Sequence, residues 1–459
     1  MTDRLTRAQP ATPAPLPTAD GAARDRELGW ALRALCVTET VSYGVLYYAF
    51  PVLAGSITAD TGWSTTAITA VFSAALVVSG LAGIVVGRLL DRYGPRWVMT
   101  GGSALGVAAV VVIATAPTFW LFTAGWLLAG FGMAAVFYPP AFTAVTVWFG
   151  PKRVRALTAI TLLAGFASTI FAPLTAALDA HLSWRDTYLV LAAVLAVITV
   201  PAHVIALRPA WRHPESEAAP PEPDRAEPDR AEPDGAEPAV TAPDAAGSVD
   251  LVPVDRRVFG LLAAAFTIYD VCLYATVVGT VPLVQERGYS ATAASWALGI
   301  AGAGQVLGRL GYAQLVRRIG LRTRTVVIFA VSVVTSGLFA ILPGPYGLLV
   351  AVSLVAGNAR GLATLLSATT ISDRWGTARY ARLNGVFNAP LMIASAIAPF
   401  LGAGLAALLG GYPAAFAVLA GLGLVAVLLV TLDPGRPEGL RSLPPRGRGR
   451  RYYRRGTQE

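Results

Sequence analysis

The sequence predicts an all-α membrane protein in which twelve transmembrane helices form two pseudo-symmetric six-helix bundles. Three observations lead to this prediction. First, 55% of the 459 residues are hydrophobic and only 14% are charged, and the mean hydropathy is +0.58, which is outside the range of soluble domains. Second, twelve stretches are apolar enough and long enough to cross a bilayer core of about 30 Å, which takes about 20 helical residues. Third, the chain repeats itself.

The twelve apolar stretches fall into two sets of six that flank a polar segment. They are residues 31–56, 66–90, 97–117, 119–148, 155–178, 186–207, 258–284, 290–316, 325–343, 346–371, 380–406 and 411–432. We therefore predict a disordered tail (1–29), an N-terminal bundle (30–207), a disordered linker (208–256), a C-terminal bundle (257–433) and a basic tail (434–459).

The repeat relates residues 43–96 to residues 269–322 at a constant offset of 226, without a gap, and 15 of the 54 pairs are identical. Gly62-Trp-Ser64 aligns with Gly288-Tyr-Ser290. A parallel duplication of an apolar chain is typical of transporters built from two similar bundles, with the binding site expected where the bundles meet near the middle of the membrane.

The basic residues predict the orientation of the chain, because Lys and Arg in short loops stay on the cytoplasmic side. With the N-terminus inside, 32 of the 36 basic residues lie on that side. We therefore expect a multi-pass protein with both termini cytoplasmic. The ratio of 35 Arg to one Lys is typical of a GC-rich bacterial source, so we expect the membrane to be the cytoplasmic (inner) membrane. The net charge of +9 thus reflects topology and does not indicate a nucleic-acid partner. The Arg-rich segment 446–455 is either a contact for anionic lipid headgroups or a solvated flank.

The linker contains a pentad that occurs three times from residue 222 to residue 236, beginning Glu-Pro-Asp each time. Such a Pro-rich, charged composition cannot bury a core. We interpret the segment as a cytoplasmic tether, with a docking role as the alternative.

A motif between the second and third apolar stretches carries a specific pattern: Gly87-Arg-Leu-Leu-Asp91-Arg92-Tyr-Gly94-Pro-Arg96. It resembles the signature loop of the major facilitator superfamily. The resemblance implies that Gly87, Asp91, Arg92, Gly94 and Arg96 act in gating on the cytoplasmic side. In the second half the position of Asp91 is occupied by Arg317, so only one of the two loops keeps a carboxylate.

A second resemblance covers most of the N-terminal half, through Gly130-Phe-Gly-Met, Tyr138-Pro-Pro and Arg153-Val-Arg-Ala-Leu157 among others. These segments are similar to the monocarboxylate and oxalate/formate transporter branch. In that branch an arginine of the eighth helix receives the substrate carboxylate, and Arg309 matches it here. The acid that precedes this arginine in proton-coupled members is Gln305 in this chain, and the first-helix lysine of those carriers is replaced near Tyr47.

Ionisable groups inside apolar stretches lead to similar residues without the family, because such groups are costly in a bilayer and usually face a cavity or a partner. Four of them stand out: Glu39, Asp270, Arg309 and Arg360. We predict that Glu39 and Asp270 are proton-coupling residues; the alternative is that Asp270 and Arg360 form a structural pair. The predicted substrate-binding residues are Arg309, Arg360, Tyr43, Tyr47, Gln305, Tyr138, Asn358 and Asn388.

Other chemistry has no basis in the sequence. There is no phosphate-binding Gly-Lys-Ser/Thr loop, and the three histidines, His181, His203 and His213, are too dispersed for a metal site. We expect no metal, no cofactor and no enzymatic activity.

The predicted function is secondary active transport of a small organic anion, a carboxylate, by alternating access in a monomer, with protons as the candidate coupling ion. Two alternatives remain open: proton-driven efflux of a drug or secondary metabolite, and a membrane sensor that does not transport.

Overall fold

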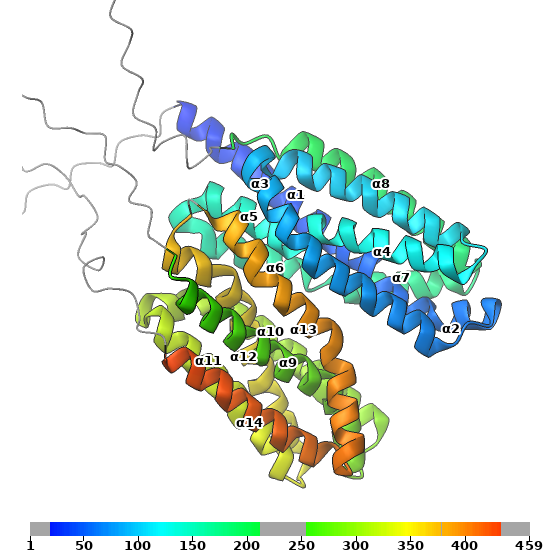
Figure 1. Ribbon diagram of the computed structural model, residues 1–459, viewed down its shortest axis with the longest axis vertical. Coiled ribbons are helices and arrows are strands. Elements are labelled where there is room, and N and C mark those ends of the chain that lie inside the picture. Colours follow the sequence, from blue (N-terminus) through cyan, green and yellow to red (C-terminus); the bar gives the residue numbers. More distant parts are fainter. Residues whose placement is uncertain (1–18, 212–253, 378, 433–459) are drawn as a thin grey trace, which may run out of the picture. The chain divides into compact units, whose positions relative to one another are not determined.

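The computed structural model describes residues 19–211, 254–377 and 379–432, and within these ranges the chain is helical with short connections (Figure 1). The repeat at 222–236, the basic tail 434–459 and most of the N-terminal tail lie outside the described residues. The first helix begins at Ala19, earlier than residue 30, where the sequence predicts the first bundle to start.

The helices of the first half follow the predicted apolar stretches, and several of them are broken. They are α1 (Ala19–Tyr43), the π-helical turn η1 (Gly44–Tyr48), α2 (Ala49–Thr61), α3 (Thr65–Thr115), α4 (Phe119–Val136), α5 (Tyr138–Phe149), the 3₁₀ turn η2 (Gly150–Lys152), α6 (Arg153–Ala164), α7 (Ala167–Asp179) and α8 (Trp184–Ala206).

The helices of the second half are longer and less interrupted. They are α9 (Arg256–Glu286), α10 (Ala291–Arg318), α11 (Leu321–Ile341), α12 (Tyr346–Trp375), α13 (Tyr380–Leu409) and α14 (Tyr412–Thr431).

The described helices account for twelve membrane spans. Nine stretches of the described chain are long and apolar enough to cross a membrane. Two of these contain two spans each: α3 is divided at Gly94, where the backbone leaves the helical region (φ 73, ψ 173), and Phe119–Asp179 comprises α4 and α5 followed by α6 and α7. Helix α10 supplies the twelfth, since its 28 residues suffice for the bilayer core. The predicted all-α membrane fold with twelve spans is confirmed.

The sequence repeat has a structural counterpart at the connection between the first two spans of each half. Gly62 (φ 70) and Gly288 (φ 85) both adopt the left-handed conformation. Two residues later, the hydroxyls of Ser64 and Ser290 accept hydrogen bonds from backbone N–H groups three residues ahead, at 3.2 Å in both cases. Each serine thus caps the following helix, and the duplicated residues preserve one helix-to-helix connection twice.

The acids that precede these connections have related roles. Asp60 accepts a hydrogen bond from the indole of Trp184 (2.9 Å) and pairs with Arg185 at the start of α8. Glu286, which aligns with Asp60 at the offset of 226, accepts one from the backbone N–H of Tyr412 (3.0 Å) at the start of α14. A carboxylate near a helix N-terminus is favourable. In each half of the chain, the acid at the end of the first span therefore helps to hold the start of the last span, α8 or α14.

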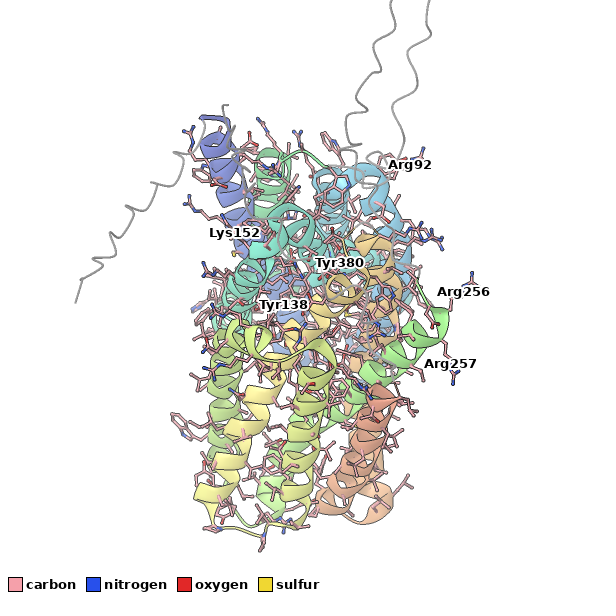
Figure 2. All side chains as sticks on the ribbon, turned by 90° about the vertical axis from the view of Figure 1, so that its left-hand side faces the viewer. Arg92, Tyr138, Lys152, Arg256, Arg257 and Tyr380 are labelled. Carbon is pink, nitrogen blue, oxygen red and sulfur yellow. The ribbon has the colours of Figure 1, made fainter. Side chains whose placement is uncertain are left out.

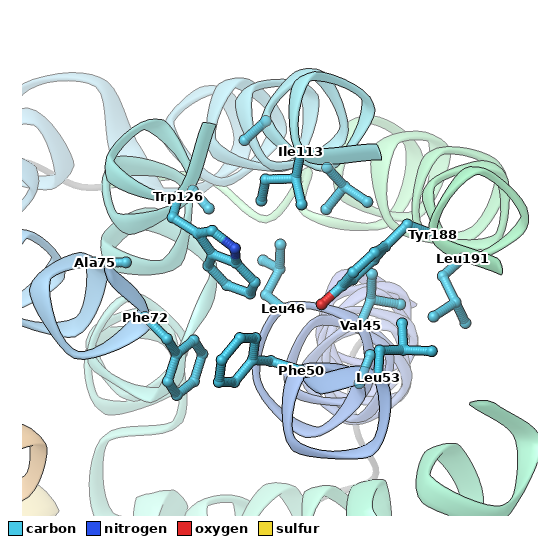
Figure 3. Close-up of a cluster of buried hydrophobic side chains, with 14 of the residues drawn as sticks. Val45, Leu46, Phe50, Leu53, Phe72, Ala75, Ile113, Trp126, Tyr188 and Leu191 are labelled. Atoms are coloured by element: carbon cyan, nitrogen blue, oxygen red, sulfur yellow. The ribbon is translucent and has the colours of Figure 1, made fainter. Parts of the chain in front are cut away.

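The contacts divide the described chain into two units, residues 19–211 with 377 and 379–396, and residues 254–376 with 397–432. The first part of α13 therefore packs in the first unit. In the core of that unit, Phe50 stacks on Phe72 (ring centroids 4.5 Å apart), and both rings meet Trp126 edge to face (Figure 3). The same Phe72 supports the ring of Tyr47 at 5.5 Å, so the aromatic core backs one of the predicted binding residues.

Candidate functional site

The break between α4 and α5 places Tyr138 inside the first unit. Phe137 has an extended backbone (φ −85, ψ −176), and Pro139 and Pro140 follow directly after Tyr138. Proline has no N–H group to donate to the preceding turn, so the helix cannot run through this segment. Phe137 and Tyr138 consequently reach aromatic partners on α1.

Three of the predicted tyrosines lie together at this break. The ring of Tyr43 stacks on Phe137 with centroids 4.0 Å apart and planes 9° apart, and it lies 4.9 Å from the ring of Tyr138. Tyr47 meets Tyr43 edge to face at 6.4 Å. Tyr43 and Tyr47 share one face of the first span, as their four-residue spacing predicts.

The turn that carries Tyr47 is π-helical, over Gly44–Tyr48. A Cβ atom at Gly44 would lie 2.2 Å from the ring of Phe171 in α7, so only glycine allows this approach. Single π-helical turns often occur at functional sites because they change the direction of the side chains that follow.

The two asparagines of α13 form a hydrogen-bonded pair beside the α4–α5 break. The side-chain amide of Asn388 donates to the side-chain oxygen of Asn384 (2.8 Å), and Asn384 donates to the carbonyl oxygen of Pro139 (3.3 Å). Asn388 is half-buried and Asn384 is buried. The predicted residue Asn388 is therefore held by Asn384, which is itself anchored to the break that carries Tyr138.

Glu39 lies one turn before Tyr43 and is fully buried. Neither of its carboxyl oxygens has a hydrogen-bond partner among the described residues. A buried polar group without a partner costs about 1–3 kcal/mol, and more when it is charged. The side chain thus has unused capacity for a proton or a polar ligand.

In the second unit, the predicted binding residues are positioned by a close contact between α10 and α12. Cβ atoms at Gly304 and Gly308 of α10 would lie 2.1 and 2.2 Å from the carbonyl oxygens of Leu354 and Asn358. On α12, Cβ atoms at Gly357 and Gly361 would lie 1.8 and 2.1 Å from the carbonyls of α10. Two glycines four residues apart on each helix allow the backbones to touch.

Each predicted polar residue of these two helices adjoins one of the contact glycines. Gln305 follows Gly304, and Arg309 follows Gly308. On α12, Asn358 follows Gly357 and Arg360 precedes Gly361. Because the glycines fix the distance between the helices and their rotation, they also fix the directions in which these four side chains leave the helices.

The charged groups of the second unit are buried to different degrees. Arg309 is 5% exposed, while Arg360 and Asp270 are half-buried. The guanidinium of Arg360 lies over the ring of Tyr274, 5.8 Å from its centroid, and its charge acts on Asp270. Within the described part of the chain, however, no direct salt bridge or hydrogen bond joins Asp270 and Arg360.

The predicted gating loop lies at the kink of α3, where the side chain of Trp211 covers it. A Cβ atom at Gly94 would lie 2.8 Å from Trp211, and the Trp211 indole donates to the carbonyl oxygen of Asp91 at 3.3 Å. Arg96 donates to the carbonyl oxygen of Val204 at 2.9 Å. The loop is thereby held by α8 and by the residues that follow it.

Gly87 and Arg92 have contrasting environments in this loop. A Cβ atom at Gly87 would lie 2.6 Å from the carbonyl oxygen of Ala381 in the first part of α13, so Gly87 allows close helix packing. Arg92 is exposed and points away from the helices (Figure 2). Of the five motif residues, Arg92 alone is exposed.

Comparison with known families decides the class of protein. The sequence profile of the Major Facilitator Superfamily matches residues 35–389 and 261–455. The chain belongs to the Major Facilitator Superfamily. Its fold and family are those of transporters, and the superfamily fold explains the two pseudo-symmetric bundles.

Curated relatives within the superfamily match parts of the chain. The MFS-type transporter YcxA of Bacillus subtilis is 25% identical over 134 residues, 29% of this chain and 33% of that protein. Monocarboxylate transporter 11 of Homo sapiens is 31% identical over 196 residues, 41% of this chain and 39% of that protein. The chain thus spans little more than a third of the length of these relatives.

Solved superfamily structures match nearly the whole fold. The fucose:proton symporter FucP of Escherichia coli superposes with a TM-score of 0.62 at 14% identity, over 89% of this chain and 99% of that chain. The human organic anion transporter MFSD10 superposes with a TM-score of 0.61 at 17% identity, over the same shares. At these identities the likeness establishes the fold.

Two polar pairs inside this superfamily member were not predicted from the sequence. Arg324, 4% exposed, forms a salt bridge with Asp373 and joins α11 to the end of α12. Fully buried His203 lies 2.9 Å from the hydroxyl of Ser103 through its Nδ1 atom. Both pairs join residues far apart in the chain, and only the presence of an ionisable residue near a helix end could have drawn attention to them.

Proposed function

We propose that this superfamily member is a secondary active transporter that moves a small organic anion, a carboxylate, across the membrane by alternating access, with protons as the coupling ion. The observation that carries the proposal is the pair of arginines on α10 and α12, held inside a membrane-spanning bundle by reciprocal glycine contacts. A guanidinium in such a place is costly unless it is paired, and its planar fork of donors fits a carboxylate.

The relatives support this substrate class by their names. One is a monocarboxylate transporter and one an organic anion transporter. In our proposal Arg309 and Arg360 bind the anion, and Gln305 and Asn358 beside them contribute amide hydrogen bonds. In the first unit, Tyr43, Tyr47, Tyr138 and Asn388 contribute hydroxyl and amide groups.

Proton coupling is proposed for Glu39 and Asp270. Glu39 supports this role through its burial without a hydrogen-bond partner among the described residues, and Asp270 through its position near the charge of Arg360. An anion that captures Arg360 removes a neighbouring positive charge from Asp270 and thereby favours its protonation. Movement of the anion and of a proton would then be linked. The fucose:proton symporter provides a precedent for proton coupling on this fold.

This proposal predicts a selective effect of Asp270→Asn. We expect the variant to lose most of the acceleration by an inward proton gradient but to retain exchange of one substrate molecule for another, because exchange needs no net proton movement. Gradient-driven uptake and self-exchange in liposomes measure the two processes. The double variant Asp270→Asn with Arg360→Gln tests the alternative that the two residues form a structural pair. If uptake by the double variant still depends fully on the proton gradient, Asp270 is not the proton site.

We further propose that Gly87, Asp91, Arg92, Gly94 and Arg96 gate the cytoplasmic side, in a protein of the inner membrane with both termini cytoplasmic. The support is the density of contacts on the loop: Trp211 covers Gly94, and the indole of Trp211 lies edge to face with Trp148 at 6.3 Å. We also propose that the transporter is a monomer. The predicted tether and the arginine-rich tail lie outside the described residues.

The gate proposal predicts that Trp211→Ala lowers turnover with little change in KM. Loss of the indole removes the cover from the Gly94 turn and so changes the balance between conformations, while it leaves the binding residues in place. Initial rates in liposomes over a range of substrate concentrations separate kcat from KM. Trp120→Ala is the control, since Trp120 is 80% exposed. A pure increase in KM in Trp211→Ala would contradict the role in gating.

The experiment that tests the transport proposal as a whole is uptake by the purified protein in liposomes. A panel of labelled carboxylates, organic cations and neutral solutes distinguishes the substrate classes. Saturable uptake of a carboxylate supports the proposal. Transport of lipophilic cations alone would support efflux of drugs, and the absence of any flux would indicate a sensor.

A further inference from the structure

The second unit contains a cavity that one of the proposed binding residues, Arg360, shares with residues outside the proposed site. Its volume is about 50 Å³, and its walls come from α9, α10, α11, α12 and α14. Aromatic and aliphatic side chains form much of the wall. The remainder is polar and includes Arg360 and the hydroxyls of Thr276, Ser332, Ser336 and Ser353.

The size of the cavity restricts what can bind in it. An apolar cavity of about 150 Å³ takes one benzene molecule, whereas a water molecule needs about 10–15 Å³ of such space. A cavity of about 50 Å³ therefore has room for a few water molecules but is too small for an aromatic ring.

The hydroxyls around the cavity offer mainly acceptor sites. Ser353 donates its hydrogen to the carbonyl oxygen of Leu349 in its own helix, at 2.9 Å. Ser332 lies 3.3 Å from the carbonyl oxygen of Ile328 and also shares a hydrogen bond of 2.9 Å with the hydroxyl of Tyr269. A hydroxyl that donates in this way retains oxygen lone pairs that can accept. Thr276 and Ser336 lie 3.4 Å apart across the cavity, which leaves a long and weak bond between them. This lining is suited to a ligand that donates hydrogen bonds.

Arg360, in contrast to these hydroxyls, needs hydrogen-bond acceptors. Its guanidinium carries five N–H donors. It lies over the ring of Tyr274 and near the carboxyl group of Asp270, but within the described residues it donates no hydrogen bond to a protein acceptor. A half-buried guanidinium that lines a cavity still needs acceptors for its N–H groups, so a group that accepts from Arg360 and donates to hydroxyls would satisfy both sides. Water does both.

We propose that the cavity is a binding site for ordered water that solvates Arg360 inside the second unit. The water molecules accept from the guanidinium and donate to the hydroxyls of α9, α11 and α12. The role of this water in transport rests on the proposed function: it solvates the Arg360 guanidinium between substrates, so that an arriving anion displaces water and not a protein carboxylate. Occupancy by water itself does not depend on that function.

The two cysteines of the chain make the proposal measurable by X-ray hydroxyl-radical footprinting in ¹⁸O-labelled water. Cys272 lines the cavity and is 8% exposed, while Cys36 is 5% exposed in the first unit. Radicals form from water close to the side chain that they oxidise, so Cys272 is expected to incorporate the label although bulk solvent barely reaches it. An unlabelled Cys272 in the wild-type protein would overturn the proposal.

Variants that fill the cavity provide the second arm. Ser336→Val and Ser353→Val replace a hydroxyl by methyl groups from two different helices, and each is expected to lower labelling of Cys272 by about fivefold because water loses both space and partners. Cys36 serves as the internal standard in every sample. Val334→Leu is the matched control, since Val334 lies on α11 but is 57% exposed and does not line the cavity.

The outcomes separate this inference from the transport proposal. Labelling of Cys272 that falls in both filled variants and persists in Val334→Leu supports the water site. Labelling that is unchanged in both filled variants contradicts it. If labelling behaves as expected but the wild-type protein transports no anion in liposomes, the water site stands and the proposed function fails.

Discussion

Arg309→Gln is expected to lower carboxylate uptake by about tenfold to a hundredfold, because a hydrogen bond to a charged group contributes about 1.5–3 kcal/mol. Arg309 is 5% exposed in α10, so bulk water cannot replace its contact with the anion. Arg309→Lys is expected to lose most of the uptake as well, since lysine keeps the charge but lacks the planar fork that holds both carboxylate oxygens. Concentration-dependent uptake in liposomes measures both variants.

Arg317→Gln is the control for this substitution. Arg317 is an exposed arginine at the end of the same helix, and its replacement is expected to leave carboxylate affinity unchanged. Membrane insertion is checked by expression and by elution of a single species in detergent. Wild-type affinity for the anion in Arg309→Gln would remove this residue from the binding site.

Gly357→Ala is expected to have the largest effect on stability among single-atom changes in the second unit. The added Cβ would lie 1.8 Å from the carbonyl oxygen of Ala301, and a backbone atom cannot move aside as a flexible side chain can. The helices α10 and α12 would separate, at a cost of about 1–3 kcal/mol or more. Because Arg309 and Arg360 leave the helices beside this contact, we expect transport to fall together with thermal stability.

Glycines of α10 and α12 outside the contact provide the comparison. A Cβ atom at Gly302 of α10 or at Gly347 of α12 would have no neighbour within 4 Å, and alanine favours a helix over glycine by about 1 kcal/mol. Gly302→Ala and Gly347→Ala should therefore melt at or above the wild-type temperature in detergent. Equal melting temperatures for Gly357→Ala and Gly302→Ala would show that the close contact is absent from the protein in detergent.

The spans and the repeat could be predicted because they depend on features local to the chain. Bilayer thickness sets the length of each apolar stretch, and the offset of 226 pairs Ser64 with Ser290, which form the same cap in the structure. The break at Phe137 was not predicted, since residues 119–148 form one apolar stretch, although Pro139 and Pro140 are a local signal for it. The signature motif marked the connection between the second and third apolar stretches, whereas the kink at Gly94, where a positive φ favours glycine, is a finding of the structure.

The partners across helices could not be predicted, because they depend on how the helices pack. The glycines at 304, 308, 357 and 361 are visible in the sequence, but nothing local indicates that α10 and α12 contact one another through them. Trp211 lies near the start of the predicted linker, and only the structure shows that it covers Gly94. The cavity beside Arg360 likewise requires hydroxyls from three helices that are distant in the sequence.

The central claim is that buried arginines of the second unit bind an organic anion that this protein transports. The most direct measurement is uptake of a labelled carboxylate by liposomes that contain only the purified wild-type protein, with Arg309→Gln protein in parallel liposomes and with an imposed pH gradient present or absent. We predict saturable uptake by the wild type, acceleration by an inward proton gradient, and a loss of at least about tenfold in Arg309→Gln. Carboxylate uptake that is equal in the two proteins, or absent from the wild type while neutral or cationic solutes are transported, would contradict the claim.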